Sequence, residues 1–225
     1  MGSIPVAELL EGRPYPGRGC VLANTAEDGP VLAYFVTGRS EASRARELVV
    51  RDDAAVLVRA TGQGSEHDAL RHYQAVARAE GWLVVGNGDH VSPVTASLVA
   101  GNDMGTALDP HSCEPDAPIF TPRICLASGP SGRPVFGYVR RRPDGGMDRV
   151  TWSVADLAEG GAVLLSTYDG TVESVRPSRC PVETATGSGT AAELLDELWA
   201  ALSPDLRVGA VAVRPGALGQ LLVNR

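Results

Sequence analysis

The sequence predicts an α+β fold built on a largely antiparallel sheet. Short apolar runs of strand length follow one another along the 225 residues, separated by turns that contain glycine and proline. Helical spacing of apolar residues occurs only in a few isolated segments, without the regular alternation of strand and helix that parallel sheets require. No internal repeat and no second apolar core interrupts this pattern, so we expect residues 1–225 to form a single domain.

The first two predicted strands form a β-hairpin. Apolar segments at 20–23 and 31–36 are joined by the turn sequence Asp28-Gly29-Pro30, at a spacing typical of antiparallel neighbours. Because antiparallel strands reverse direction, this pairing would bring Arg18 and Arg39 to the same end of the hairpin. Two arginines from separate strand ends could then share one site.

The other elements follow from the same patterns. Residues 66–80 have helical spacing after Ser65, a residue suited to cap a helix, and this helix would carry Tyr73 on its apolar face. Asn87 follows a buried strand at 82–85, in an Asn-Gly turn. Further helices are expected at 4–12, 93–101, 104–108 and 190–202. Further strands are expected within 47–60 on both sides of Arg51–Asp53, and at 123–128, 134–140, 147–152, 162–166, 208–213 and 221–223, whereas 171–189 looks irregular.

The segment 113–122 carries three prolines, which exclude a regular helix. It also carries Glu114 and Asp116, and Arg123 begins the strand that follows. A rigid loop with two carboxylates could form one wall of a site. The alternative is an ordinary proline-rich surface loop.

Composition excludes several classes of function. The net charge of −7 argues against a nucleic-acid-binding module. All 20 basic residues are arginine, which excludes a lysine Schiff base and the lysine of a phosphate-binding P-loop. No apolar run approaches the roughly 18 residues of a membrane helix, and no signal peptide is evident, so we expect a cytoplasmic protein.

Cysteine and histidine usage indicates no metal centre. The four cysteines are widely scattered and form no C-x-x-C motif. Cys113 and Cys125 could face each other, although free buried thiols are the preferred interpretation. The four histidines lack the spacing of a metal set, so we expect no metal and no cofactor.

The most distinctive stretch runs from Tyr34 to Arg46. A short apolar strand ends at Gly38 and is followed by three arginines and two serines: Arg39, Ser40, Ser43, Arg44 and Arg46. Arginine presents a planar fork of donors that matches phosphate or carboxylate, so this stretch could bind an anion. The alternative is a solvated basic loop.

The residue sequence of this stretch resembles the signature of the stand-alone, archaeal-type IMP cyclohydrolases, which also occur in bacteria. In that family a strand ending in GRS precedes S-R-N-R, and here Gly38-Arg39-Ser40 and Ser43-Arg44-Ala45-Arg46 hold those places. Four more blocks are similar to the family and follow in order: 15–19, Tyr73 with Asn87-Gly88, 114–124 and 166–168. The last quarter of the chain carries little resemblance.

The resemblance implies an αββα sandwich like that of the N-terminal-nucleophile hydrolases, without autoprocessing. It implies a hydrolase of the cyclic-amidine class that runs in the ring-closing direction. The substrate would be 5-formamidoimidazole-4-carboxamide ribonucleotide and the product inosine monophosphate (IMP), the last step of purine synthesis. The partner would thus be a small nucleotide, with neither nucleic acid nor membrane, and a homo-oligomer is possible.

This chemistry assigns provisional roles to the residues of the five blocks. Arg44 and Tyr73 are candidates to stabilise the oxyanion that develops on the formyl carbon, and Glu114 is the candidate general base or orienting group. Candidates for substrate binding share a polar side chain within these blocks: Arg18, Arg39, Ser40, Asn87, Asp116 and Arg123.

Two departures from the family pattern leave alternatives open. Ala45 stands where the family often has Asn, and Val91-Ser92 stand where it often has Thr-Asp. We expect these positions to lie beside the site. They favour, as a second hypothesis, an enzyme acting on another imidazole or purine-like nucleotide. A non-catalytic nucleotide-binding relative is a third, and a distant amidohydrolase on the same fold a fourth.

Overall fold

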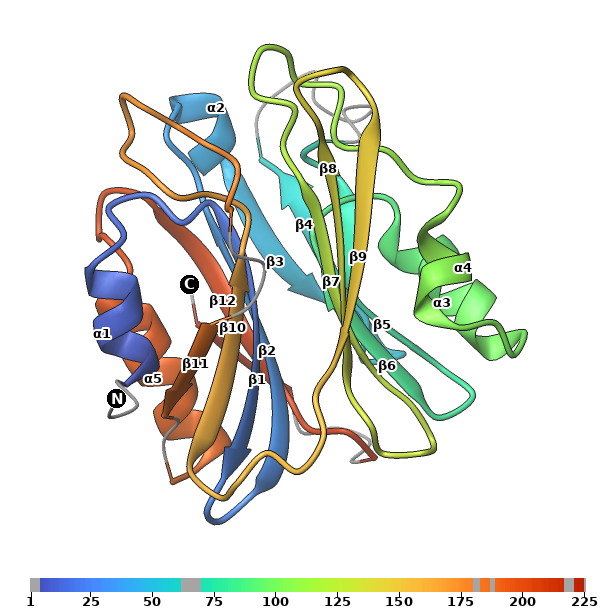
Figure 1. The fold of residues 1–225 in the computed structure, drawn as a ribbon. Coiled ribbons are helices and arrows are strands. Elements are labelled where there is room, and N and C mark those ends of the chain that lie inside the picture. Colours follow the sequence, from blue (N-terminus) through green and yellow to red (C-terminus); the bar gives the residue numbers. More distant parts are fainter. Residues whose placement is uncertain (1–4, 62–69, 180–182, 187–188, 217–220, 225) are drawn as a thin grey trace.

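The computed structural model describes residues 5–61, 70–179, 183–186, 189–216 and 221–224, and it contains two antiparallel sheets packed face to face (Figure 1). The first sheet has the order β11 (Glu183–Thr186), β10 (Gly161–Ser166), β1 (Arg18–Thr25), β2 (Gly29–Thr37), β12 (Arg207–Val213), β13 (Leu221–Asn224). The second has the order β3 (Arg46–Val50), β4 (Val56–Ala60), β5 (Tyr73–Ala79), β6 (Trp82–Gly86), β7 (Arg123–Ser128), β8 (Val135–Arg141), β9 (Met147–Ser153). The predicted α+β class with largely antiparallel sheets is confirmed.

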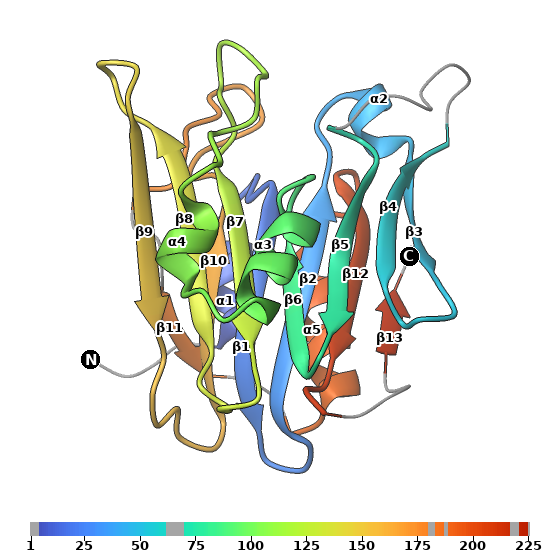
Figure 2. The same ribbon diagram turned by 90° about the vertical axis from the view of Figure 1, so that its right-hand side faces the viewer.

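Helices cover the outer face of each sheet. Helices α1 (Val6–Glu11) and α5 (Ala191–Ala201) pack on the first sheet. Helices α3 (Val91–Val99) and α4 (Met104–Leu108) pack on the second, in front of it in Figure 2. A single turn of helix, α2 (Glu41–Arg44), follows β2 at one end of the sandwich. The described chain therefore has four layers: helices, sheet, sheet, helices.

The central strands bury both faces, and this explains their continuous apolar sequences. Along β2, Tyr34 and Val36 face the other sheet, whereas Ala33 and Phe35 face the outer helices. Side chains alternate between the two faces of a strand, so each apolar run supplies two cores at once. The core between the sheets holds most of the large side chains and positions the site at one end of the sandwich.

The predicted hairpin is confirmed. Strands β1 and β2 pair antiparallel, with Arg18 opposite Val36. Arg18 itself belongs to the strand, which begins two residues earlier than predicted. Arg39 follows β2 at the same end, as expected.

The helix predicted over 66–80 is wrong for its second half. Residues 73–79 form strand β5, while residues 62–69 lie outside the described part of the chain. Tyr73 and Ala75 face the inter-sheet core, and Ala77 faces helix α3. Small residues spaced along a strand that is buried on both faces match helical spacing by coincidence, and tertiary packing overrides the helix propensity of alanine.

The segment predicted to be irregular at 171–189 contains the short strand β11. Cys20, Cys113 and Cys125 are free thiols, and Cys180 lies outside the described residues. Within the described residues, no helix combines the length and apolar character needed to cross a membrane.

Candidate active site

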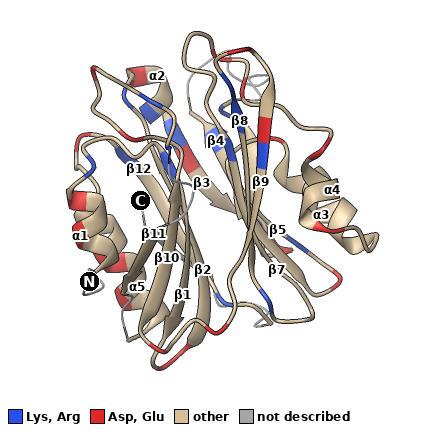
Figure 3. Cartoon of the chain, viewed as in Figure 1, with Lys and Arg blue, Asp and Glu red and all other residues tan. Residues whose placement is uncertain are grey.

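A pocket of about 280 Å³ opens at the end of the sandwich that carries α2. Both sheets and the loop before β7 contribute to its wall, and Figure 3 shows basic residues gathered at this end of both sheets. Its lining includes four arginines, Arg18, Arg39, Arg46 and Arg71, and two carboxylates, Glu114 and Asp116. Such a concentration of arginine suits a small anionic ligand.

The floor of the pocket is a buried ion pair between Arg18 and Glu114. Nη2 of Arg18 lies 2.9 Å from Oε2 and 3.1 Å from Oε1 of Glu114. The side chains are only 9% and 2% exposed. Nε of Arg18 is a buried donor that has no hydrogen-bond partner among the described residues.

Burial and pairing act in opposite directions on this pair. Burial raises the pKa of Glu114, and the Arg18 cation opposes that shift. Burial by itself would lower the pKa of Arg18, but Glu114 and the nearby tyrosines outweigh it, so the pKa of Arg18 lies well above its ordinary value. Arg18 is therefore a permanent cation, and Glu114 is a carboxylate that holds a proton more readily than an exposed glutamate.

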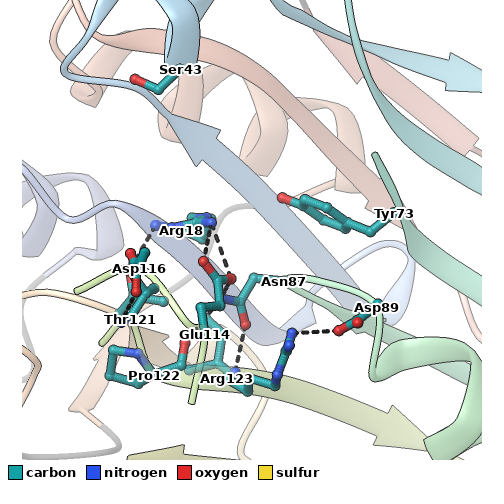
Figure 4. A network of polar contacts seen from close by, with 12 residues as sticks. Arg18, Ser43, Tyr73, Asn87, Asp89, Glu114, Asp116, Thr121, Pro122 and Arg123 are labelled. Atoms are coloured by element: carbon teal, nitrogen blue, oxygen red, sulfur yellow. Dashed lines mark hydrogen bonds and ion pairs between the residues drawn. The ribbon is translucent and has the colours of Figure 1, made fainter. Parts of the chain in front are cut away.

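Asn87 holds Glu114 in place. Its Nδ2 donates to Glu114 Oε1 at 3.0 Å and to the carbonyl of Pro122 at 3.0 Å, and its Oδ1 accepts from the backbone N–H of Ile124 at 2.6 Å (Figure 4). Asn87 has no exposed surface and is absent from the pocket lining. Its amide is thus committed to orienting the carboxylate, in place of the direct substrate contact that the sequence suggested.

Asp116 stabilises the loop that presents Glu114. Oδ1 of Asp116 accepts from the backbone N–H of Thr121 at 2.7 Å, and its Oδ2 contacts the Thr121 hydroxyl. The backbone N–H of Glu114 donates to the Thr121 carbonyl at 2.8 Å. Asp116 also lines the pocket, so the prediction that this loop forms a site wall agrees with its position.

Arg46, rather than Arg44, is the buried arginine that the serine- and arginine-rich stretch contributes to the pocket lining, in addition to the exposed Arg39. Arg46 is 7% exposed and donates to the carbonyls of Ser43 at 2.6 Å and Thr37 at 3.1 Å. Arg44 is exposed, donates to the Arg39 carbonyl at 2.8 Å, and is absent from the pocket lining. The two arginines differ because they belong to different elements: Arg46 begins β3 and shares its inward face with Leu48, whereas Arg44 ends the exposed helix α2.

Tyr73 lies behind the two buried arginines. Its hydroxyl points toward Arg18 in Figure 4, and it is 2.7 Å from the hydroxyl of Tyr34. Both Arg18 and Arg46 are close enough to interact electrostatically with Tyr73. Tyr73 is absent from the pocket lining, so the structure places its hydroxyl beside Arg18 and not in the pocket wall.

The rim of the pocket is polar and more exposed. Ser40 and Ser43 form a reciprocal capping box at the start of α2, and both line the pocket with Arg39. Arg39 donates to the carbonyl of Val172 at 3.3 Å. Arg71 enters the rim from the segment before β5.

The guanidinium group of Arg123 is bound to protein atoms outside the pocket. Its Nε donates to the carbonyl of Ser112 at 2.9 Å, and its Nη1 lies 2.7 Å from Asp89. It packs beneath Gly88, where a Cβ would approach Nη1 to 2.3 Å. Arg123 therefore supports the loop around Asn87 and is absent from the pocket lining.

Sequence reasoning missed an aromatic wall. Tyr15 and Tyr168 line the pocket and stack with ring centroids 5.4 Å apart. The Tyr168 hydroxyl contacts Thr121, which ties this wall to the Glu114 loop. The Tyr15 and Tyr168 positions fall in two of the family-like blocks, and that was the only available signal for them.

The departures at Ala45 and Val91-Ser92 do not lie in the pocket wall, contrary to expectation. Val91 begins helix α3 and is buried against the outer face of the second sheet. The Ser92 hydroxyl donates to Gln74 at 2.7 Å on the exposed side of β5. Ala45 ends helix α2.

Two other hollows lie near the opposite end of the sandwich, where β1 and β9 end. They enclose about 260 and 570 Å³. Their charged residues, Arg133, Asp156 and Glu159, are exposed, so these hollows lack the buried charges of the α2 end.

The fold and this pocket together define an α+β sandwich protein with an arginine-rich pocket whose lining suits a small anionic molecule. Comparison with known proteins makes the class specific. A family model described as IMP cyclohydrolase-like protein matches residues 15–216, a range that includes every residue of the pocket lining. The chain belongs to this family. An IMP cyclohydrolase of Halobacterium salinarum is 30% identical to this chain over 170 residues. The alignment covers 73% of this chain and 79% of that protein, and the values are the same for the proteins of strains R1 and NRC-1.

Proposed function

We propose that this chain closes 5-formamidoimidazole-4-carboxamide ribonucleotide to IMP with loss of water, as a cytoplasmic enzyme of purine synthesis. The family and the relatives named IMP cyclohydrolase support this proposal. The observation that carries it is the buried Glu114 carboxylate, held by Arg18 and Asn87 at the floor of an arginine-rich pocket.

Ring closure consists of one nucleophilic attack, proton transfers and the loss of water. The carboxamide nitrogen attacks the formyl carbon, and one amide proton ends on the formyl oxygen. The resulting hydroxyl then leaves as water with the proton of the formamido nitrogen. No atom is oxidised or reduced, so no redox cofactor is required. An amide is a weak nucleophile, so holding the two groups in register contributes a large share of the rate.

Glu114 is the proposed proton acceptor. A carboxylate whose pKa is raised by burial accepts a proton at higher pH than an exposed one, which brings it closer to the pH at which the enzyme works. The bonds from Arg18 and Asn87 fix both oxygens, so the carboxylate is oriented before substrate arrives.

Arg18, Arg46 and Tyr73 are the proposed electrostatic partners of the formyl oxygen. Arg18 has a buried Nε donor without a partner among the described residues, and Arg46 is a second buried cation lining the same pocket. Donors fixed in a buried site stabilise a developing oxyanion more strongly than donors in water do. Arg46 thereby takes the role that the sequence suggested for Arg44.

The 5′-phosphate is proposed to bind at the rim. Arg39, Ser40, Ser43 and Arg71 supply cations and hydroxyls there, at a distance from the buried Arg18–Glu114 pair. A phosphate keeps part of its hydration at such a rim, whereas the neutral imidazole ring can enter the buried part of the pocket. Tyr15 and Tyr168 offer that ring an aromatic wall.

An ultraviolet assay of ring closure tests the proposal. Wild-type protein should convert the formamido substrate to the hypoxanthine chromophore in a saturable manner. Glu114→Gln should lower kcat by about 10²–10⁴-fold. Glu47→Gln, which removes a carboxylate from an exposed ion pair with Arg59, serves as the matched control and should leave kcat unchanged.

Two outcomes would replace the proposal with the alternatives. A folded protein that binds IMP but does not close the ring would point to a non-catalytic relative. A protein that neither closes this substrate nor binds IMP would point to a different imidazole or purine-like nucleotide. Ala45 and Val91, the departures that favoured this latter alternative, lie outside the pocket wall.

A further inference from the structure

A hydroxyl pair joins the two sheets directly behind the site. Tyr34, in the middle of β2, and Tyr73, at the start of β5, place their hydroxyl oxygens 2.7 Å apart. Tyr34 has no exposed surface, whereas Tyr73 is 6% exposed. Neither tyrosine has another hydroxyl partner within the described part of the chain.

The pair has two hydroxyl protons, but the bond between its members uses only one. If Tyr73 donated to Tyr34, the Tyr34 proton would be buried without an acceptor, because the Tyr34 hydroxyl has no other hydrogen-bond partner among the described residues and the charged side chains that act on it are the cations Arg18 and Arg46. A buried donor without a partner costs about 1–3 kcal/mol. If Tyr34 donates to Tyr73, the remaining proton belongs to the hydroxyl that points toward Arg18, a residue of the pocket lining (Figure 4).

The environment keeps Tyr34 in its protonated, donating form. Burial raises the pKa of the Tyr34 phenol well above its ordinary value, and the neighbouring Tyr73 adds to this effect, although Arg18 and Arg46 oppose it. At any working pH Tyr34 thus carries a proton to donate.

We propose that Tyr34 is a positioning residue for the ring closure proposed above, on which this inference rests. It donates its hydrogen bond to the Tyr73 oxygen, and so directs the Tyr73 proton toward the side of the pocket where Arg18 and Arg46 meet the formyl oxygen. Tyr34 touches no reacting atom and acts only through Tyr73. Its donation also makes the Tyr73 hydroxyl a stronger donor, since hydrogen bonds in a chain polarise one another.

A double-mutant cycle separates this role from a purely structural one. The variants are Tyr34→Phe, Tyr73→Phe and the combination of both, measured for kcat, KM and thermal stability. Tyr73→Phe should lower kcat by about 10²-fold, the usual effect of losing one oxyanion donor. Tyr34→Phe should lower kcat by about 10-fold with KM changed less than twofold, and it should have no further effect when Tyr73 is already Phe.

Tyr138→Phe is the matched control. Tyr138 is buried in the same inter-sheet core, and its hydroxyl donates to the carbonyl of Ser178 at 2.6 Å. This variant also loses one buried hydrogen bond, so its stability should fall by a similar amount while kcat stays at the wild-type value.

The kcat values of these variants test the role of Tyr34. Wild-type kcat in Tyr34→Phe, effects of the two substitutions that multiply in full, or an equal loss of kcat in Tyr138→Phe would overturn the inference while leaving the proposed function intact. A wild-type protein that does not close the ring would refute the proposed function, and this inference with it.

Discussion

Replacing Glu114 by Gln should destabilise the protein far more than an ordinary surface substitution does. The Glu114 carboxylate accepts two hydrogen bonds from Arg18 and one from Asn87. Glutamine has one acceptor oxygen, and its amide N–H₂ would face a donor of Arg18 or Asn87. The substitution also leaves the buried Arg18 cation without its counterion.

Breaking a buried ion pair in this way costs about 3–5 kcal/mol. For a protein of this size, about 1 kcal/mol lowers Tm by roughly 2–4 °C, so Tm should fall by roughly 6–20 °C. The exposed pair between Glu47 and Arg59, with side chains 31% and 55% exposed, provides the comparison. Glu47→Gln should cost at most about 1 kcal/mol.

Urea unfolding followed by far-ultraviolet circular dichroism at pH 7 measures both differences. A third variant, Arg18→Met with Glu114→Leu, removes both charges and should recover most of the lost stability without recovering activity. If Glu114→Gln were no more destabilising than Glu47→Gln, the reasoning about the buried charge would be refuted. If the double variant stayed as unstable as the single one, packing rather than charge would be the cause.

Three further predictions concern the backbone, the acid limit and the arginine assignment. Gly17→Ala should lower the free energy of unfolding, measured in urea, more than Gly29→Ala does. Both glycines have positive φ, but a Cβ meets other side chains, at 2.3 Å, only at Gly17. Gly29→Ala should therefore cost only the conformational strain of about 1–2 kcal/mol. Burial, with Arg123 and a neighbouring imidazole, lowers the pKa of His90 well below 6.5. Below pH 6.5 the unfolded chain should therefore bind a proton at His90 that the folded chain does not bind. The free energy of unfolding of the wild type should fall by up to about 1.4 kcal/mol per pH unit more than that of His90→Gln. Arg46→Ala should lower kcat/KM by about 10²-fold in the ultraviolet assay, whereas Arg44→Ala should change it less than threefold.

Each of these predictions has a contradicting result. Equal stability of the two glycine variants would show that the space around Gly17 adjusts to a methyl group. Parallel stability curves of the wild type and His90→Gln between pH 7 and 5 would show that the imidazole protonates inside the fold. A larger loss of activity in Arg44→Ala than in Arg46→Ala would restore the original assignment.

The fold class and most element positions could be predicted from the sequence because the strands are short, apolar and bounded by turn residues. Helix α4 occupies 104–108, the range that the spacing indicates. The failure at β5 has a physical cause: alanine-rich strands buried on both faces carry neither a clear alternation nor a β-branched bias. Strand β11 was missed because its four residues form a strand through hydrogen bonds to β10, and their own sequence does not show a strand pattern.

The candidate site was predictable in outline but not in its division of roles. Glu114 and Arg18, both chosen as candidates from the shared blocks, form an ion pair that the sequence did not predict. The sequence could not tell which polar groups are already engaged, and Asn87 and Arg123 proved to be bound to other protein atoms. Hydrogen-bond partners from distant segments decide that question, and no local pattern encodes them.

The pocket draws its walls from both sheets, with Arg18 on β1 of the first and Arg46 on β3 of the second. No part of the chain that forms only one sheet can therefore assemble it. The spacing between Arg18 and Tyr73 is set by how the large side chains between the sheets interdigitate, far from any substrate. Activity should consequently vanish together with the inter-sheet core during unfolding and return only with it. Recovery of ring closure after refolding would then report the final packing step of the whole sandwich.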